Sequence, residues 1–307
     1  MTVKPDMITI LGHTAAGKTG IAASVAFKVG GEVISADSRQ VYRDMSVGTG
    51  KDLDDYIVND RMVPVHLVDI RDAGEEYNVF EFQKDFHLAF GGIRSRGMIP
   101  VLCGGSGMYL EAVLRGYDMI KVPVNKDLRE SLEGKSLEEL GRILSSYREL
   151  HNNTDTDTVK RAIRAIEIAD FIKKEGSAVD NFLSPASLTF GIRYERDERR
   201  SRITRRLMQR LEEGMIEEAE ALLARGISHD KLEYYGLEYK YLSLYLKEEL
   251  SYEEMIERLN TAIHQFAKRQ MTYFRGMERR GIKIHWLQGE EDHAVLADRI
   301  ADAWQSI

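Results

Sequence analysis

Short apolar runs alternate with amphipathic stretches through the first third of the chain. The predicted strands are residues 7–11, 32–35, 64–70 and 99–103, and the predicted helices are 21–28 and 80–96. Short apolar strands separated by helices are typical of a parallel sheet that is covered by helices on both faces. The pattern therefore predicts an α/β fold with a parallel, doubly wound sheet.

After about residue 117 the pattern becomes helical. Apolar residues recur at helical spacing in 136–150 and 159–174, whereas residues 188–192 alternate as in a strand. Residues 198–280 are again helical, and 282–287 predicts a last short strand. We expect strand 188–192 to rejoin the first sheet. The expected segments are an α/β core at 1–116, a helical insertion domain at 117–186, and a return to the core with a helical C-terminal part at 187–307.

Composition places the chain among soluble globular proteins. It has 307 residues, of which 43% are hydrophobic and 30% are charged. No apolar run approaches the roughly 18 residues that cross a bilayer, and the first residues lack the apolar core of a secretion signal. We therefore expect a cytoplasmic protein without a membrane partner. The single cysteine, Cys103, excludes an internal disulfide and is expected to be buried at a strand end.

The net charge of −7 argues against a protein that coats nucleic acid through charge alone. A local basic face is still possible, because eight arginines and three acids lie between Arg193 and Arg210. At helical spacing Arg202, Arg206 and Arg210 share one face, and this pattern alone predicts a solvated face.

The most specific motif is Gly12–Thr19, which follows the first predicted strand and reads G-x-x-x-x-G-K-[ST]. Such a loop directs backbone N–H groups and a helix N-terminus at one anion, while Lys18 adds positive charge and Thr19 a hydroxyl ligand for magnesium. The predicted phosphate-binding residues are Gly12, His13, Thr14, Ala15, Ala16, Gly17, Lys18 and Thr19. The motif predicts binding of a diphosphate or polyphosphate. By itself the motif is more typical of a nucleotide-binding protein, a kinase or NTPase that binds ATP or GTP.

Two more clusters of small and polar residues follow predicted strands. Ser35–Ser38 follows strand 32–35, and Gly104–Gly107 follows strand 99–103. Because the carboxyl ends of parallel strands meet at one edge of the sheet, ligands gather there. We therefore expect both clusters to lie beside the phosphate loop.

Longer blocks follow the phosphate loop in a fixed order. Ile34–Tyr42 reads I-S-A-D-S-R-Q-V-Y, Ile99–Tyr109 reads I-P-V-L-C-G-G-S-G-M-Y, and Ala267–Arg275 reads A-K-R-Q-M-T-Y-F-R. Shorter blocks are Gly48–Lys51, His66–Ile70, Tyr77–Gln83 and Arg164–Glu167. In sequence and order these blocks resemble the tRNA dimethylallyltransferases, or isopentenyl transferases, nearly from end to end. The resemblance implies a P-loop NTPase-like fold and a prenyl transferase.

The resemblance also implies roles for individual residues. In this family a dimethylallyl group passes from dimethylallyl diphosphate to N6 of adenine 37, beside the anticodon of a tRNA. Lys18 and a Mg²⁺ ion held partly by Thr19 would neutralise the diphosphate leaving group. Arg206 matches a diphosphate-binding arginine that assists catalysis, and Arg202 lies one helical turn earlier. Asp37 matches the catalytic aspartate, the base that accepts the proton of the weakly nucleophilic adenine amine.

Contacts to the acceptor follow from the same match. The expected tRNA-binding residues are Asp37, Ser38, Arg39, Gln40, Ser106, Arg129, Lys160, Arg161 and Arg164. Because the target adenine must leave its stack, the shape of the site and hydrogen bonds to the base edge should select it. The expected partners are the tRNA anticodon arm and the prenyl diphosphate, and a monomer is expected.

The chain departs from the family pattern at a few positions. Gly50 and Asp52 stand where the family's G-T-A-K-P block has alanine and proline, and His13 stands where the phosphate loop has proline. The stretch between Tyr117 and Thr189 is shorter than in the family, and it is the part that grips the anticodon arm there. The shortened stretch therefore concerns recognition of the acceptor, whereas Lys18, Thr19 and Arg206 of the diphosphate chemistry match the family.

Three alternatives to tRNA prenylation stay open at this point. A related transferase would prenylate free AMP, ADP or ATP. A P-loop kinase or NTPase would turn over ATP, with Asp69 at a strand end as a possible metal ligand. A non-catalytic RNA-binding relative is disfavoured, because Asp37, Lys18, Thr19 and Arg206 are all present.

Overall fold

The computed structural model describes residues 4–117, 119–147, 156–176 and 184–307. The chain divides into two compact units, Met1–Tyr117 with Leu183–Ile307, and Asp118–Phe182. The first unit has two hydrophobic cores, and the second unit has one of its own. In the described part of the chain, no helix is both long and apolar enough to cross a membrane.

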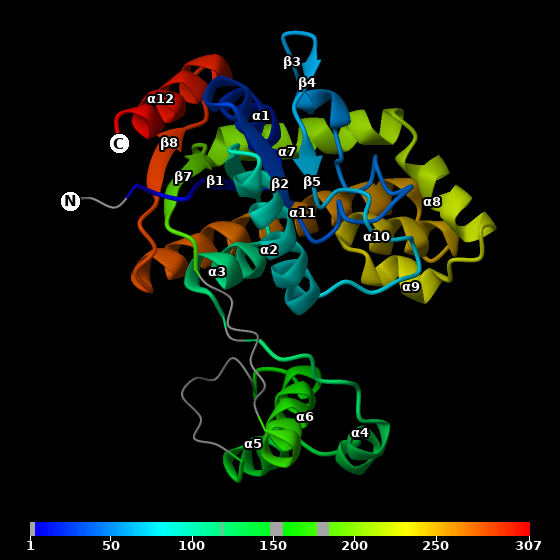
Figure 1. The fold of residues 1–307 in the computed structure, drawn as a ribbon. Coiled ribbons are helices and arrows are strands. Elements are labelled where there is room, and N and C mark those ends of the chain that lie inside the picture. Colours follow the sequence, from blue (N-terminus) through cyan, green and yellow to red (C-terminus); the bar gives the residue numbers. More distant parts are fainter. Residues whose placement is uncertain (1–3, 118, 148–155, 177–183) are drawn as a thin grey trace. The chain divides into compact units, whose positions relative to one another are not determined.

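A six-stranded sheet forms the centre of the first unit (Figure 1). Its strands are β1 Met7–Gly12, β2 Gly31–Ala36, β5 Val65–His66, β6 Ile99–Gly104, β7 Ser187–Arg193 and β8 His285–Gln288. Their order is β5-β2-β6-β1-β7-β8, and every neighbouring pair is parallel. The predicted parallel α/β sheet is confirmed, and so is the return of the chain to it, because β7 pairs with β1 from Met7↔Ser187 to Gly12↔Ile192.

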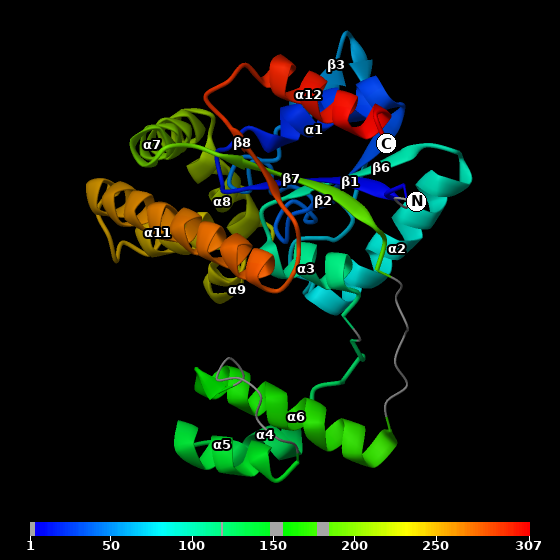
Figure 2. The ribbon, with the colours of Figure 1, turned by 90° about the vertical axis from the view of Figure 1, so that its left-hand side faces the viewer.

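Helices cover both faces of this sheet. They are α1 Lys18–Val29, α2 Val79–Ser95, α3 Gly107–Arg115, α7 Arg196–Glu212, α8 Met215–Ala224, α9 His229–Tyr234, α10 Leu237–Leu246, α11 Tyr252–Arg279 and α12 His293–Gln305. Figure 2 shows α1 and α12 on one side of the sheet and α2, α3 and α11 on the other. Along β1, Ile8 and Ile10 join the core beneath α1 and α12, whereas Met7 and Leu11 join the opposite core. This alternation follows the two-residue period of a strand.

The predicted strand at 64–70 is much shorter in the structure. Only Val65 and His66 pair with β2. Leu67 and Asp69 have backbone φ angles of 64° and 54°, which no strand accommodates, so the chain leaves the sheet there. The preceding segment forms the short helix η1 Leu53–Tyr56 and a small hairpin of β3 Ile57–Val58 and β4 Arg61–Met62.

The second unit is a small helical domain. It contains α4 Lys126–Leu132, α5 Leu137–Ser145 and α6 Val159–Glu175, which bury Leu132, Leu140, Leu144 and Ile166. Asn125, Ser136 and Thr158 cap the N-termini of the three helices with their side chains. The predicted helix at 136–150 ends at Ser145 within the described residues. Residues 151–158, whose polar sequence predicts a turn, and residues 176–185, whose sequence predicts a loop, lie mostly outside the described residues.

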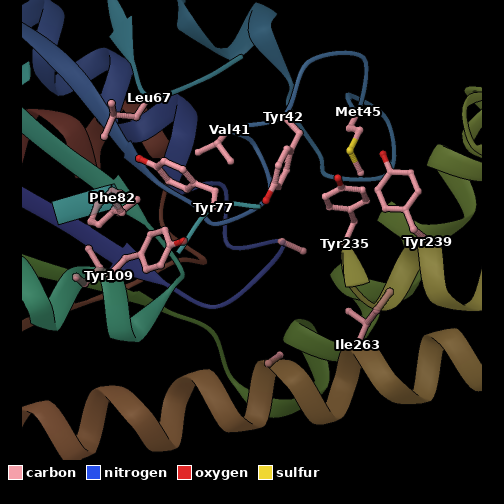
Figure 3. Close-up of a cluster of buried hydrophobic side chains, with 14 of the residues drawn as sticks. Val41, Tyr42, Met45, Leu67, Tyr77, Phe82, Tyr109, Tyr235, Tyr239 and Ile263 are labelled. Atoms are coloured by element: carbon pink, nitrogen blue, oxygen red, sulfur yellow. The ribbon is translucent and has the colours of Figure 1, made fainter. Parts of the chain in front are cut away.

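Aromatic side chains fill the core between the sheet and helices α2, α3, α9 and α10 (Figure 3). Phe82 is fully buried and stacks on Tyr109, with ring centroids 4.3 Å apart and an interplanar angle of 18°. Tyr42 and Tyr235 meet edge to face, with centroids 4.6 Å apart. This core fixes the segment after β2 against the helices that follow the second unit.

We predict that Phe82→Ala lowers the free energy of unfolding by about 3–5 kcal/mol, because it leaves a cavity in this aromatic core. Leu88→Ala on the same helix is the matched control, since Leu88 is 66% exposed. Its effect should stay within about 0.5 kcal/mol. Urea unfolding followed by tryptophan fluorescence measures both, and equal losses for the two variants would contradict the proposed packing.

Candidate active site

A cavity of about 530 Å³ opens at the carboxyl ends of β1, β2 and β6 in the first unit. This is the edge of a parallel sheet at which ligands bind. The residues that line it come from the phosphate loop, the segments after β2 and β6, helices α7 and α11, and the α9–α10 turn. The three clusters that the sequence placed at strand ends therefore do lie together.

The phosphate loop joins β1 to α1 through a tight turn. Ala15 and Gly17 adopt φ angles of 60° and 69°, and a Cβ on Gly17 would come within 2.3 Å of the His293 ring. Lys18 Nζ folds back and donates to the carbonyl of His13 at 3.1 Å. Of the predicted loop residues, five line the cavity, namely Thr14, Ala15, Gly17, Lys18 and Thr19. The other three, Gly12, His13 and Ala16, are buried outside the cavity wall.

His13 is a buried support for the loop, with no side-chain role in the cavity. Its Nδ1 donates to the Thr14 carbonyl at 2.6 Å, and its ring meets Tyr194 edge to face. Burial lowers the pKa of His13 to about 4, so the ring is neutral at physiological pH.

Gln270 on α11 ties the phosphate loop to the segment after β6. Its Oε1 accepts from the Thr14 N–H at 2.9 Å, and its Nε2 donates to the Gly105 carbonyl at 2.9 Å. The sequence block that contains Gln270 was recognised, but this bridging role was not predicted. Only the fold brings residues so distant in the chain together.

The segment after β2 lines the cavity with Asp37, Ser38, Arg39 and Gln40. Asp37 Oδ1 accepts from the Arg39 N–H at 2.8 Å, which orients the carboxylate. The Ser38 N–H donates to Ser106 Oγ at 3.1 Å, and the Arg39 guanidinium lies over the Tyr234 ring at 5.4 Å. The structure thus brings the predicted base and its neighbours together with Ser106.

Arginines of α7 form the wall of the cavity beside the phosphate loop. Arg202 Nε donates to the Ala15 carbonyl at 3.1 Å, and its guanidinium stacks on Tyr194 at 4.5 Å. Arg206 Nη2 lies 3.5 Å from the Gly50 carbonyl and 3.6 Å from Asp52. Arg210 also lines the cavity and is only 7% exposed, so the expectation of a solvated residue is wrong for it. The i, i+4, i+8 spacing could have placed all three arginines at one site.

Burial perturbs the cationic groups of this wall. The pKa of Lys18 is lowered by burial, and the nearby Arg206 adds to the effect. Burial likewise lowers the pKa of Arg210 to about 10, and the positive charge of Arg206 adds to the effect.

Burial raises the pKa of the Glu238 carboxyl, which lines the same cavity and was not predicted as a site residue. Cys103 is buried as expected, and burial raises its pKa to about 12.

The four predicted tRNA contacts of the insertion belong to the second unit. Arg129 makes a two-pronged ion pair with the buried Glu167, and Arg164 pairs with the same carboxylate. Arg161 pairs with Asp157, and Lys160 is exposed. Three of the four residues thus have ion pairs within their own unit.

Asp69 is not part of the cavity wall. Its carboxylate pairs with the buried Lys51, whose Nζ also donates to the Tyr42 carbonyl at 2.6 Å. Within the described residues, no group of three or more His, Cys, Asp and Glu side chains could hold a metal ion. A Mg²⁺ ion often has few protein ligands and completes its shell with phosphate oxygens and water. The partly buried Thr19 hydroxyl in the cavity fits that kind of site.

Comparisons with known proteins agree with this geometry. A family model described as IPP transferase matches residues 40–277, and one described as isopentenyl transferase matches residues 5–66. The chain is 59% identical over 284 residues to tRNA dimethylallyltransferase 2 of Phocaeicola vulgatus, with 92% of each chain covered. It is 58% identical over 297 residues to tRNA dimethylallyltransferase 1 of Porphyromonas gingivalis, with 97% of each covered.

Solved structures give the same result and support the predicted P-loop NTPase-like fold. The full-length tRNA isopentenylpyrophosphate transferase of Bacillus halodurans superposes with a TM-score of 0.69 at 33% identity, covering 99% of this chain and 98% of that one. A eukaryotic dimethylallyltransferase acting on tRNA shares the fold at 22% identity, with a TM-score of 0.75 and coverage of 98% and 77%. From its sequence matches and its fold together, the chain belongs to the IPP transferase family.

Proposed function

We propose that this protein transfers a dimethylallyl group from dimethylallyl diphosphate to N6 of adenine 37 in tRNA. The observation that carries the proposal is a single cavity that combines a phosphate loop, an oriented carboxylate and a wall of guanidinium groups. The names of the relatives, which are tRNA dimethylallyltransferases at up to 59% identity, support tRNA as the acceptor.

At the donor end, the protein stabilises the diphosphate that leaves. The backbone N–H groups of the phosphate loop, the N-terminus of α1 and Lys18 face the phosphate oxygens. Arg206 adds a charge-assisted contact, and Arg202 holds the loop through the Ala15 carbonyl. The electrostatic interactions of these groups become strongest as negative charge develops on the leaving oxygen. They therefore lower the barrier to breaking the carbon–oxygen bond.

At the acceptor end, Asp37 accepts the proton of the adenine amine as the carbon–nitrogen bond forms. The amine lone pair is delocalised into the ring, so proton removal by a positioned carboxylate is needed. The hydrogen bond from the Arg39 N–H occupies Oδ1 and leaves Oδ2 for the amine. Ser38, Arg39, Gln40 and Ser106 surround the flipped adenine in this proposal.

Magnesium is part of the proposal. Thr19 would hold a Mg²⁺ ion together with the diphosphate, and the ion would neutralise charge on the leaving group. Contacts of Arg129, Lys160, Arg161 and Arg164 with the anticodon arm stay predictions, as do a monomeric state and a cytoplasmic location.

We predict that the purified protein, given Mg²⁺ and labelled dimethylallyl diphosphate, labels a tRNA with unmodified adenine 37. The same tRNA with guanine at that position is the matched control and should stay unlabelled. Parallel reactions offer AMP, ADP and ATP as acceptors, and a further one omits the prenyl donor and measures ATP turnover. Label in free nucleotides alone would move the protein to nucleotide prenylation, and ATP turnover without a donor would make it a kinase or NTPase.

We predict that Asp37→Asn lowers the rate of prenyl transfer by about 10²–10⁴-fold, because the amide cannot accept the proton. Asparagine keeps the oxygen that accepts from Arg39, so the fold and tRNA affinity should stay unchanged. Asp60→Asn is the control, since Asp60 is exposed and lies outside the cavity wall. An equal loss of tRNA binding would argue against the assignment of Asp37 as the base.

We predict that removing Mg²⁺ with EDTA abolishes prenyl transfer. Thr19→Ala should raise the Mg²⁺ concentration that gives half-maximal activity, because it removes a hydroxyl ligand, while Thr19→Ser should restore the wild-type requirement. A Mg²⁺ titration of all three proteins measures this. Full activity in EDTA would show that the reaction needs no divalent ion.

A further inference from the structure

Arg210 is a buried cation that the proposed mechanism has not used. It lies on α7 one turn after Arg206, lines the same cavity and is 7% exposed. Its Nη2 atom is buried and has no hydrogen-bond partner. A buried guanidinium nitrogen without an acceptor costs free energy, so an acceptor in the cavity would stabilise it.

The nearest counterion of Arg210 is shared and weakly placed. Asp52 Oδ2 lies 3.7 Å from Arg210 Nη2 and 3.6 Å from Arg206 Nη2, both beyond hydrogen-bond distance. Within the described residues, this is the only ion pair of Arg210. Asp52, itself 52% exposed, is thus the ion-pair partner of both guanidinium groups. The buried Glu238 carboxyl also attracts them, but burial raises its pKa and so weakens it as a counterion.

Gly50 makes room for both guanidinium groups. A Cβ at this position would come within 1.7 Å of Arg210 Nη2 and 2.1 Å of Arg206 Nη2, so the two side chains cross directly over its Cα. Gly50 and Asp52 are also the two positions at which the G-T-A-K-P block departs from the family pattern. Both departures therefore contact the same pair of arginines.

An anion in the cavity would supply the acceptor that Arg210 Nη2 lacks. The cavity already carries a phosphate loop, Lys18 and Arg206, all suited to phosphate oxygens. A guanidinium binds two oxygens of one phosphate at once, which a single carboxylate at 3.7 Å does not provide. The lowered pKa of Arg210, about 10, is consistent with a cation that lacks its anion.

We propose that Arg210 is a further ligand of the diphosphate group of the prenyl donor. In this arrangement Asp52 holds Arg206 and Arg210 over Gly50 until the diphosphate takes its place. The proposal rests on the proposed function, since it assigns the cavity to an organic diphosphate. It adds a residue of this chain that the family motifs do not mark.

Inorganic pyrophosphate with Mg²⁺ is the probe, and isothermal titration calorimetry measures its dissociation constant. Arg210→Gln should weaken pyrophosphate binding on the order of ten- to a hundredfold, the loss expected for a charge-assisted hydrogen bond. Arg205→Gln is the matched control, because Arg205 lies on the same helix but is exposed and outside the cavity wall. Unchanged binding by a folded Arg210→Gln protein would overturn the proposal.

Two further variants separate anion binding from a structural role. Arg210→Lys keeps the charge but loses the planar group that donates two parallel hydrogen bonds. Its affinity for pyrophosphate should therefore fall between those of wild type and Arg210→Gln. Asp52→Asn removes the competing carboxylate, so its pyrophosphate affinity should equal or exceed that of wild type. A loss of thermal stability in the arginine variants with an unchanged dissociation constant would assign Arg210 to structure alone. A weaker affinity in Asp52→Asn would overturn the role given to Asp52.

The same experiment separates this inference from the proposed function. Pyrophosphate binding needs neither tRNA nor prenyl transfer. If pyrophosphate binding depends on Arg210 but the protein labels no tRNA, the role of Arg210 is supported and tRNA is ruled out as the acceptor. If the protein prenylates tRNA but binds pyrophosphate independently of Arg210, the proposed function is supported and the role of Arg210 is ruled out.

Discussion

Positive charge that is partly withdrawn from water at the end of β1 is the constraint on which the cavity depends. Burial lowers the pKa of Lys18 and brings that of Arg210 to about 10, so the protein holds both cations at a cost. Asp52 compensates two guanidinium groups only from 3.6 and 3.7 Å. Folding has thus already met part of the desolvation cost that binding of a multivalent anion would otherwise require.

The scaffold keeps that charge in place through contacts between distant segments. Helix α7 packs its apolar side, which includes Ile203 and Leu207, into the core. This packing turns Arg202, Arg206 and Arg210 toward the cavity. Helix α11 contributes Gln270, which fixes the Thr14 N–H and the Gly105 carbonyl. The phosphate loop is therefore held by residues more than 180 positions later in the chain, and its shape depends on the packing of both helices on the sheet.

The parts of the site that the sequence predicts are those in which structure is local. The phosphate loop, the strand ends and Asp37 lie within continuous blocks whose spacing sets their geometry, and the cavity contains them as expected. The length of strand β5 is overestimated from the sequence, because an apolar run does not reveal that Leu67 and Asp69 take left-handed backbone angles. The sequence fails to predict the burial of Arg210 for a related reason. A helical wheel shows which residues share a face, but only the packing of the following helices shows whether that face meets solvent or a cavity.

Charge is distributed unevenly in this chain, because basic side chains gather around the cavity. The sequence carries a net charge of −7, yet the residues around the cavity include seven lysines and arginines and five acids. Burial raises the pKa of one of those acids, Glu238, which weakens its role as a counterion, and the Arg39 N–H orients the carboxylate of Asp37. The cavity is thus the cationic part of an acidic protein. Such focused charge favours binding of phosphate groups at the cavity, as the proposed donor site requires.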